Sequence, residues 1–207
     1  TRDSVDVEIT ADQREFLLVD TAGLRKRTKV NESVEYYSNL RTHRAVEACD
    51  VACLFVDASR TIEQQDLRVL KEVKDARKGI VLVANKWDLV HKDEEKLKRW
   101  NDEVDKKMQG LGFIPVLTIS CLTEMRVDKV LDTAWVVAQE RKKRLPSPDL
   151  NRWLEKLNQR YQPPAVNGKR VKIAYVTQIG VLPPKFAFFA NHPHLLKPPY
   201  KRFLENQ

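Results

Sequence analysis

Three apolar runs of the chain each pass directly into a polar segment, in the way that buried strands end at a ligand site. The runs span residues 15–19, 79–84 and 115–119. They lead into Asp20-Thr21-Ala22-Gly23, Asn85-Lys86-Trp87-Asp88 and Ser120-Cys121-Leu122. In an open parallel sheet, ligands bind beyond the carboxyl ends of the strands. One such tetrapeptide would be weak support, but three in series predict that the segments converge on one crevice.

The segment at 85–88 carries the donor and the acceptor that guanine requires. The amide of Asn85 can pair with acceptors on one edge of the base, while the carboxylate of Asp88 accepts from its ring N–H and exocyclic amine. Adenine presents the opposite pattern and would leave that carboxylate unpaired, so the site should reject it. We expect Lys86 to lay its aliphatic stem along the base or ribose, the alternative being an ordinary surface lysine. Backbone N–H groups around Cys121 are expected to meet the base carbonyl.

The segment at 20–23 suits a phosphate group that carries a metal ion. Asp20 would hold Mg²⁺ through water, and the N–H of Gly23 would face the γ-phosphate, because a residue without Cβ lets the backbone come that close. Thr21 and Ala22 lie between them and belong to the same predicted site. The alternative for Asp20 is a helix N-cap. Together the motifs predict GTP or GDP and Mg²⁺ as ligands.

The sequence contains no loop of the form G-x-x-x-x-G-K-[ST]. Such a loop supplies backbone N–H groups and a lysine for the β- and γ-phosphates. The chain also starts at Thr1 rather than at a methionine. We therefore expect the strand, phosphate loop and first helix to lie upstream of it, and we expect guanine recognition but not hydrolysis from this chain alone.

Apolar periodicity predicts an α/β architecture. Alternating Val5, Val7 and Ile9 predict a strand that pairs, across a turn at 11–14, with the strand ending at Asp20. Helical periodicity at 34–48, 62–76, 93–109 and 126–144 alternates with strands, which predicts a mostly parallel sheet flanked by helices on both faces. Residues 23–33 have no apolar period and are expected to form a switch loop that the γ-phosphate orders.

A domain boundary is expected after residue 145, which gives domains of 1–145 and 146–207. Prolines there end the preceding helix, and Ser147 is expected to cap a new helix at 148–161. Strands are expected at 169–178 and 185–190. Phe186 and Phe188 share one face of the second strand; they could stack bases, but we favour packing against the preceding helix.

These motifs, taken with the tail, resemble the second GTPase domain and C-terminal KH-like domain of Der, also called EngA, the bacterial tandem GTPase of ribosome assembly. The resemblance covers nearly the whole chain, and the tail makes it specific to this family. It is carried by Thr1-Arg2-Asp3, Asp20-Thr21-Ala22-Gly23-Leu24-Arg25, Asn85-Lys86-Trp87-Asp88, Gln162-Pro163-Pro164, Val171-Lys172-Ile173-Ala174-Tyr175 and Tyr200-Lys201-Arg202-Phe203-Leu204. It implies a P-loop NTPase-type fold, a small α+β KH-like domain, and GTP hydrolysis in assembly of the large ribosomal subunit.

The resemblance also implies individual roles. Thr1 matches a switch I threonine that would ligate Mg²⁺ together with Asp20. Leu24 stands where many GTPases carry a water-orienting glutamine, so the catalytic group is unknown; relatives of this kind use potassium as an assisting ion. The tail lacks a G-x-x-G clamp, and its closing strand is expected beyond Gln207.

Positive charge is concentrated in the tail. The chain has a net charge of +8, and residues 146–207 carry ten Lys and Arg against three Asp and Glu. Such asymmetry indicates a polyanionic partner, because neutralised phosphates release counterions; the alternative is a solvated basic surface. We expect ribosomal RNA and the large ribosomal subunit as partners, and no DNA. The candidates for phosphate contacts are Lys169, Arg170, Lys172, Lys185, Lys201 and Arg202.

Composition limits the classes of protein to which the chain can belong. A hydrophobic content of 42% suffices for a core, and no run of about 18 apolar residues or signal-peptide pattern occurs, so we expect no membrane anchor and a cytoplasmic protein. The three cysteines have no metal-ligand spacing and are expected to be reduced. Two alternatives remain: a non-catalytic RNA- or ribosome-binding module with an incomplete guanine site, and a GTPase of transfer-RNA modification, which should lack the basic tail.

Overall fold

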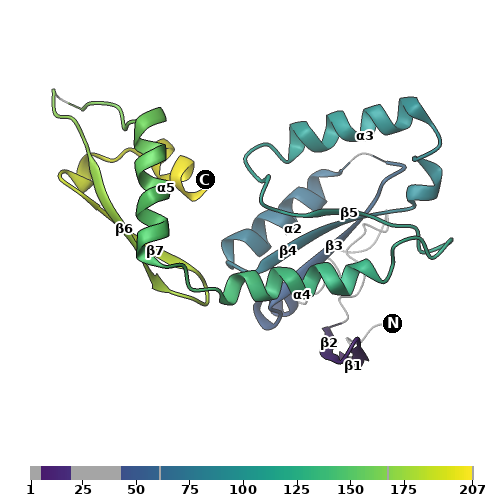
Figure 1. The fold of residues 1–207 in the computed structure, drawn as a ribbon. Helices are drawn as coiled ribbons and strands as arrows, with labels where there is room; N and C mark the ends of the chain where they lie inside the picture. The colour runs from purple at the N-terminus through teal and green to yellow at the C-terminus, as the bar shows by residue number, and fades with distance from the viewer. Residues whose placement is uncertain (1–5, 20–42, 61, 167, 207) are drawn as a thin grey trace, which may run out of the picture. The chain divides into compact units, whose positions relative to one another are not determined.

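The computed structural model describes residues 6–19, 43–60, 62–166 and 168–206 (Figure 1). The chain divides into two compact units. One consists of Thr1–Gln109 and Ile114–Ala138, and the other of Gly110–Phe113 and Gln139–Gln207. Each unit is described by itself.

The first unit is built on a parallel sheet with the strand order β3-β4-β5. Its strands are β3 (Val51–Asp57), β4 (Gly79–Asn85) and β5 (Val116–Thr118). The central strand β4 is buried almost throughout, because it is paired on both edges and covered on both faces. The predicted parallel sheet is therefore confirmed.

Helices cover this sheet. They are α2 (Gln64–Asp75), α3 (Glu94–Lys107) and α4 (Lys129–Lys142), and residues 43–48 are also helical. Figure 1 shows α3 and α4 on opposite sides of the strands. Val130 and Val137 of α4 pack with Val81 and Val83 of β4, which point to one face because strand side chains alternate. The helices predicted at 62–76, 93–109 and 126–144 agree with α2, α3 and α4 to within three residues at each end. The start of the helix predicted at 34–48 lies outside the described residues.

The hairpin of β1 (Asp6–Ala11) and β2 (Arg14–Val19) is confirmed. Asp12 and Gln13 form its turn with φ of 49° and 61°, the left-handed pair that matches the twist of hairpin strands. One expectation is wrong: β2 does not lie in the sheet of β4 and β5. Within the described residues it pairs only with β1 and reaches the rest of the unit through α4, where Arg14 lies over the Trp135 ring at 5.4 Å.

The second unit is a helix-backed hairpin. It contains α5 (Ser147–Arg160), β6 (Ile173–Gly180), β7 (Lys185–Ala190), a 3₁₀ turn η2 (Pro193–Leu195) and α6 (Pro198–Glu205). Its core consists of Leu150, Leu154, Leu157, Ile173, Val176, Tyr200 and Leu204. Phe188 packs on Trp153 with ring centroids 6.5 Å apart, as expected, whereas Phe186 remains 39% exposed.

The predicted cap at Ser147 is wrong. Helix α5 begins at Ser147, and Pro146 is the residue before its first turn. The Ser147 hydroxyl lies 3.1 Å from the Thr177 hydroxyl and so contacts the sheet instead of the helix N-terminus. Asn151 also joins α5 to β6, since its side chain exchanges two hydrogen bonds with the Val176 backbone, at 2.9 and 3.0 Å.

Candidate functional site

The segments that follow β4 and β5 lie side by side. The backbone N–H of Ile119 donates to the Ala84 carbonyl, and that of Trp87 donates to the Ile119 carbonyl, both at 2.9 Å. These bonds continue the strand pairing past the last residue of β5. Two of the three polar segments predicted to converge are therefore adjacent in space.

The Asn85 side chain fastens the two segments together. Its Oδ1 accepts from the backbone N–H groups of Lys86, at 2.7 Å, and Cys121, at 3.0 Å. The Cys121 N–H, which we expected to meet the base carbonyl, is thus committed to Asn85 in this structure. Among the described residues, the Nδ2 amine of Asn85 and the N–H of Leu122 have no acceptor, so both remain available as donors.

Ser120 positions Asp88. The Ser120 side chain is fully buried, and its hydroxyl donates a hydrogen bond to Oδ1 of Asp88 while accepting the Thr123 N–H. Within the described part of the chain, Oδ2 of Asp88 receives no hydrogen bond. A carboxylate held from one side offers its second oxygen as an acceptor, beside the donor that Asn85 provides.

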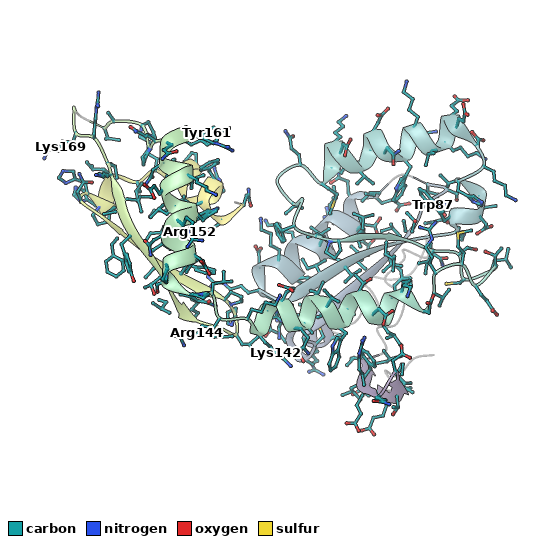
Figure 2. The ribbon with its side chains drawn as sticks, viewed as in Figure 1. Trp87, Lys142, Arg144, Arg152, Tyr161 and Lys169 are labelled. Atoms are coloured by element: carbon teal, nitrogen blue, oxygen red, sulfur yellow. The ribbon has the colours of Figure 1, made fainter. Side chains whose placement is uncertain are left out.

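Buried tryptophans support the loop between these groups. Trp87, labelled in Figure 2, is 7% exposed. It meets Trp100 of α3 edge-on, with ring centroids 6.1 Å apart. Lys86 directly precedes it with φ of 64°, a left-handed conformation. Trp87 is buried, whereas Lys86 before it is exposed and Asp88 after it is partly exposed.

Sequence reasoning missed Asp57, the last residue of β3. Its side chain is only 3% exposed and lies 2.7 Å from Nζ of Lys86. Burial raises the pKa of this carboxyl, but hydrogen bonds from Lys86 and Ser59 outweigh burial and hold the pKa below its usual value. A signal was present, because Asp57 ends an apolar run just as Asp20 and Asn85 do.

The structure does not describe the phosphate side of the predicted site. Thr1, Asp20, Thr21, Ala22, Gly23 and Leu24 lie outside the described residues, as does the expected switch loop. No group of three His, Cys, Asp or Glu residues that could hold a metal ion occurs in the described ranges. The Mg²⁺ ligands therefore remain predictions.

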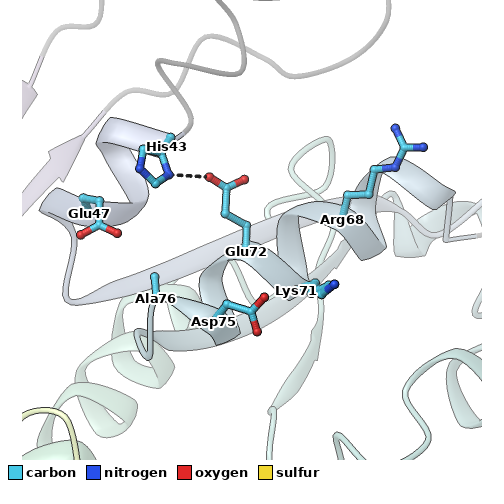
Figure 3. A pocket seen from close by; sticks show the side chains of 7 residues that line it. All are labelled: His43, Glu47, Arg68, Lys71, Glu72, Asp75 and Ala76. Carbon is cyan, nitrogen blue, oxygen red and sulfur yellow. Dashed lines mark hydrogen bonds and ion pairs between the residues drawn. The ribbon is translucent and has the colours of Figure 1, made fainter.

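A hollow of about 440 Å³ lies between residues 43–47 and α2 (Figure 3). A bond of 3.0 Å joins His43 Nδ1 to Glu72 Oε1 across it. Its lining carries charges of both signs and consists of His43, Glu47, Arg68, Lys71, Glu72, Asp75 and Ala76. None of the predicted nucleotide residues lines this hollow, so it is not the guanine site.

All six basic candidates for RNA contact are exposed. Lys169 projects from the segment before β6, as Figure 2 shows. Asn191 fixes the neighbouring backbone by donating to the Arg170 carbonyl at 3.1 Å and accepting the Lys172 N–H at 2.8 Å. In the part of the chain that the structure describes, no helix has both the length and the apolarity needed to cross a membrane.

Comparison with known proteins matches both units to family models. The elongation factor Tu GTP-binding domain matches residues 1–140, and the C-terminal KH-domain-like model of EngA bacterial GTPase enzymes matches residues 144–207. GTPase Der of Chlorobium phaeobacteroides (strain BS1) is 43% identical over all 207 residues, and GTPase Der of Chlorobium luteolum is 42% identical. The chain spans about half the length of these curated relatives, 48% in both cases.

Solved structures share the fold. Era in complex with MgGDPNP and nucleotides 1506–1542 of 16S ribosomal RNA matches 100% of this chain and 74% of its own, with a TM-score of 0.54 and 17% identity. The elongation factor SelB of Methanococcus maripaludis, in complex with a GTP analogue, matches 67% of this chain and 28% of its own, with a TM-score of 0.55 and 19% identity. The architecture is that of a P-loop GTPase domain followed by a KH-like domain.

Proposed function

Because this chain belongs to the Der (EngA) GTPase family, of which it matches the C-terminal GTP-binding and KH-like region, we propose that it binds guanine nucleotides at the ends of β4 and β5. The base would lie against Asn85, Lys86, Asp88 and the segment 120–122. The tail would contact ribosomal RNA during assembly of the large ribosomal subunit.

One observation carries this proposal: a donor and an acceptor stand uncommitted at one place. Nδ2 of Asn85 and Oδ2 of Asp88 have no partner among the described residues, while their neighbouring oxygens are fixed by Cys121 and Ser120. Guanine offers acceptors at O6 and N7 and donors at N1 and N2, so it complements this pair. Adenine would leave the Asp88 carboxylate facing an acceptor.

For the phosphates we propose Asp20, Thr21, Ala22 and Gly23, with Mg²⁺ held by Asp20 and Thr1. When bound, Mg²⁺ neutralises charge on the β- and γ-phosphates. The sequence has no phosphate-cradling loop, so hydrolysis is proposed for the protein extended upstream, with potassium as the assisting ion. The catalytic group is unassigned.

For the tail we propose that the nucleotide state repositions it on ribosomal RNA in the cytoplasm. Supporting this are the excess of positive charge in residues 146–207 and the exposure of all six basic candidates. Era, a neighbour that covers the whole chain, was solved with a segment of 16S ribosomal RNA. The same charge also fits a second candidate, an RNA-binding module that works without nucleotide.

Binding of fluorescent GDP and ATP tests the first proposal, using both this chain and a chain extended upstream to the length of its Der relatives. Each would be titrated in Mg²⁺ with either potassium or sodium. We expect the extended chain to bind GDP and discriminate against ATP. Absence of GDP binding in both chains, together with RNA binding that ignores guanine nucleotide, would favour the second candidate.

A further inference from the structure

Asp57 is a buried charge that the proposed contacts to the base do not use. Its side chain is 3% exposed at the end of β3, directly opposite Asn85 in the strand register. The Ala58 N–H donates to the Asn85 carbonyl at 2.8 Å, so the ends of β3 and β4 are locked together. A carboxylate at this depth requires partners, because an unpaired buried charge is strongly unfavourable.

The two carboxylate oxygens of Asp57 accept hydrogen bonds from different residues. Oδ1 accepts the Ser59 hydroxyl at 2.6 Å and the Ser59 N–H at 3.1 Å, which closes the local turn after β3. Oδ2 accepts from Lys86 Nζ at 2.7 Å, across the gap between the two strand ends. The turn requires only Oδ1. At Oδ2 the hydrogen bond comes from Lys86, and Nε of Arg60 lies farther from the same oxygen, at 3.8 Å.

We propose that Asp57 is a positioning residue of the guanine site, which holds the Lys86 side chain extended across the ends of β3 and β4 so that its stem is ready to pack on the base or ribose. The inference rests on the proposed guanine-binding function. A lysine tethered only at its Cα loses rotamer freedom when a ligand orders it, and that loss weakens binding. Lys86 is anchored at both ends, by its left-handed backbone and by Asp57, yet its side chain stays 49% exposed.

The opposite reading makes a different prediction. If the ion pair only closes the strand ends, Lys86 must leave Asp57 before it can meet a nucleotide. Removing the Asp57 charge would then leave GDP affinity unchanged or raise it. The direction in which GDP affinity changes when the Asp57 charge is removed therefore distinguishes the two interpretations.

Asp57→Asn is the informative variant. The asparagine retains a carbonyl oxygen for Ser59 but places an amine, which cannot accept from Lys86, where Oδ2 stood. Ser59→Ala is the matched control, because it weakens the turn and leaves the Lys86 pair intact. In the upstream-extended chain we expect Asp57→Asn to weaken GDP binding about tenfold, as loss of a charge-assisted contact would, and Ser59→Ala to change it by less than about twofold.

Lys86→Ala supplies the test of mechanism. If Asp57 acts through Lys86, adding Asp57→Asn to Lys86→Ala lowers GDP affinity by less than about twofold more. A full tenfold loss in that background, or no loss in the single variant, would overturn the inference while wild-type GDP binding upholds the proposed function. Failure of the wild-type extended chain to bind GDP would instead overturn both.

Discussion

At the residue scale, the candidate site depends on polar side chains in which one polar atom is bonded to the protein and the other is available to a ligand. Asn85 and Asp88 each commit one oxygen to the protein, through Cys121 and Ser120, and leave the other end open. Such bonds fix the direction of a side chain before any ligand arrives, which lowers the entropy lost on binding. The same division occurs in Asp57, between the Ser59 turn and Lys86.

The charge state of Asp57 should appear in the pH dependence of stability. Although burial raises its pKa, hydrogen bonds from Lys86 and Ser59 bring the pKa below the usual value. A carboxyl whose pKa is lowered by folding stabilises the protein above its unfolded pKa of about 3.9, and this contribution is lost as the pH falls through the folded value. We expect the difference in unfolding free energy between wild type and Asp57→Asn to shrink as the pH falls below about 5. Urea titrations followed by tryptophan fluorescence would measure it, and a difference independent of pH would contradict the assignment.

Cysteine reactivity provides a second test at this scale. Cys121 is exposed in the segment after β5, whereas burial, with a smaller effect from Cys49, raises the pKa of the Cys53 thiol to about 11. At pH 8 iodoacetamide should therefore modify Cys121 well before Cys53. If a base binds here, GDP should slow the Cys121 reaction and ATP should not. Mass spectrometry of tryptic peptides would follow both sites, and equal rates with and without GDP would place the nucleotide elsewhere.

At the element scale, the sequence predicts what local patterns determine. The Asp12-Gln13 turn and the strands that lead to the two polar segments follow from hydrophobic periodicity and turn chemistry. The turn occurs where expected, and β4 and β5 end within one residue of their expected ends, at Asn85 and Thr118. Ser147 failed as a cap because a tertiary contact with Thr177 uses its hydroxyl. Asp57 was missed because its partner Lys86 is adjacent only after β3 and β4 pair in parallel. Contacts between residues distant in sequence are not visible in local periodicity.

Gln178 of β6 is a buried polar residue whose partners, like those of Asp57, include residues distant in sequence. Its Oε1 accepts the Leu145 N–H at 2.7 Å, and its Nε2 donates to the carbonyls of Lys143 and Gly180, both at 3.1 Å. The side chain thus ties the segment before α5 to the hairpin.

Replacing Gln178 by leucine should be destabilising. The change would remove three hydrogen bonds to the backbone, and we expect it to lower the free energy of unfolding by about 1–3 kcal/mol, since each bond contributes roughly 0.5–1.5 kcal/mol. The control Arg152→Ala, at a side chain 68% exposed, should change the free energy by no more than about 0.5 kcal/mol. Thermal denaturation would compare them, and equal melting temperatures would show that these bonds contribute nothing.

At the scale of the whole molecule, the two units differ in charge and therefore in expected partners. The excess positive charge belongs to residues 146–207, whose basic side chains are exposed. Binding dominated by phosphate contacts weakens linearly with the logarithm of salt concentration. Affinity for RNA should therefore be a property of the tail and should depend strongly on salt.

The pair Lys201→Ala and Arg202→Ala tests this on α6. We expect the double variant to weaken RNA binding and to reduce the salt slope by roughly 1 to 2, since each phosphate contact contributes somewhat less than one unit. Lys98→Ala with Arg99→Ala removes an equally basic exposed pair from α3 and should leave the slope unchanged. Fluorescence anisotropy of a labelled ribosomal RNA fragment over a range of salt would decide, and identical slopes for the two variants would refute a tail-specific interface.

The central claim is that Asn85 and Asp88 recognise guanine, and exchanging Asp88 for asparagine tests it most directly. Xanthine carries a carbonyl where guanine has its exocyclic amine, so the amide of Asp88→Asn would donate to xanthine where the carboxylate accepted from guanine. In the upstream-extended chain we expect the variant to lose GDP affinity by at least about tenfold and to gain affinity for xanthosine diphosphate, reversing the wild-type preference. If Asp88→Asn kept its preference for GDP, the base would not lie against Asp88 and the account of this site would be wrong.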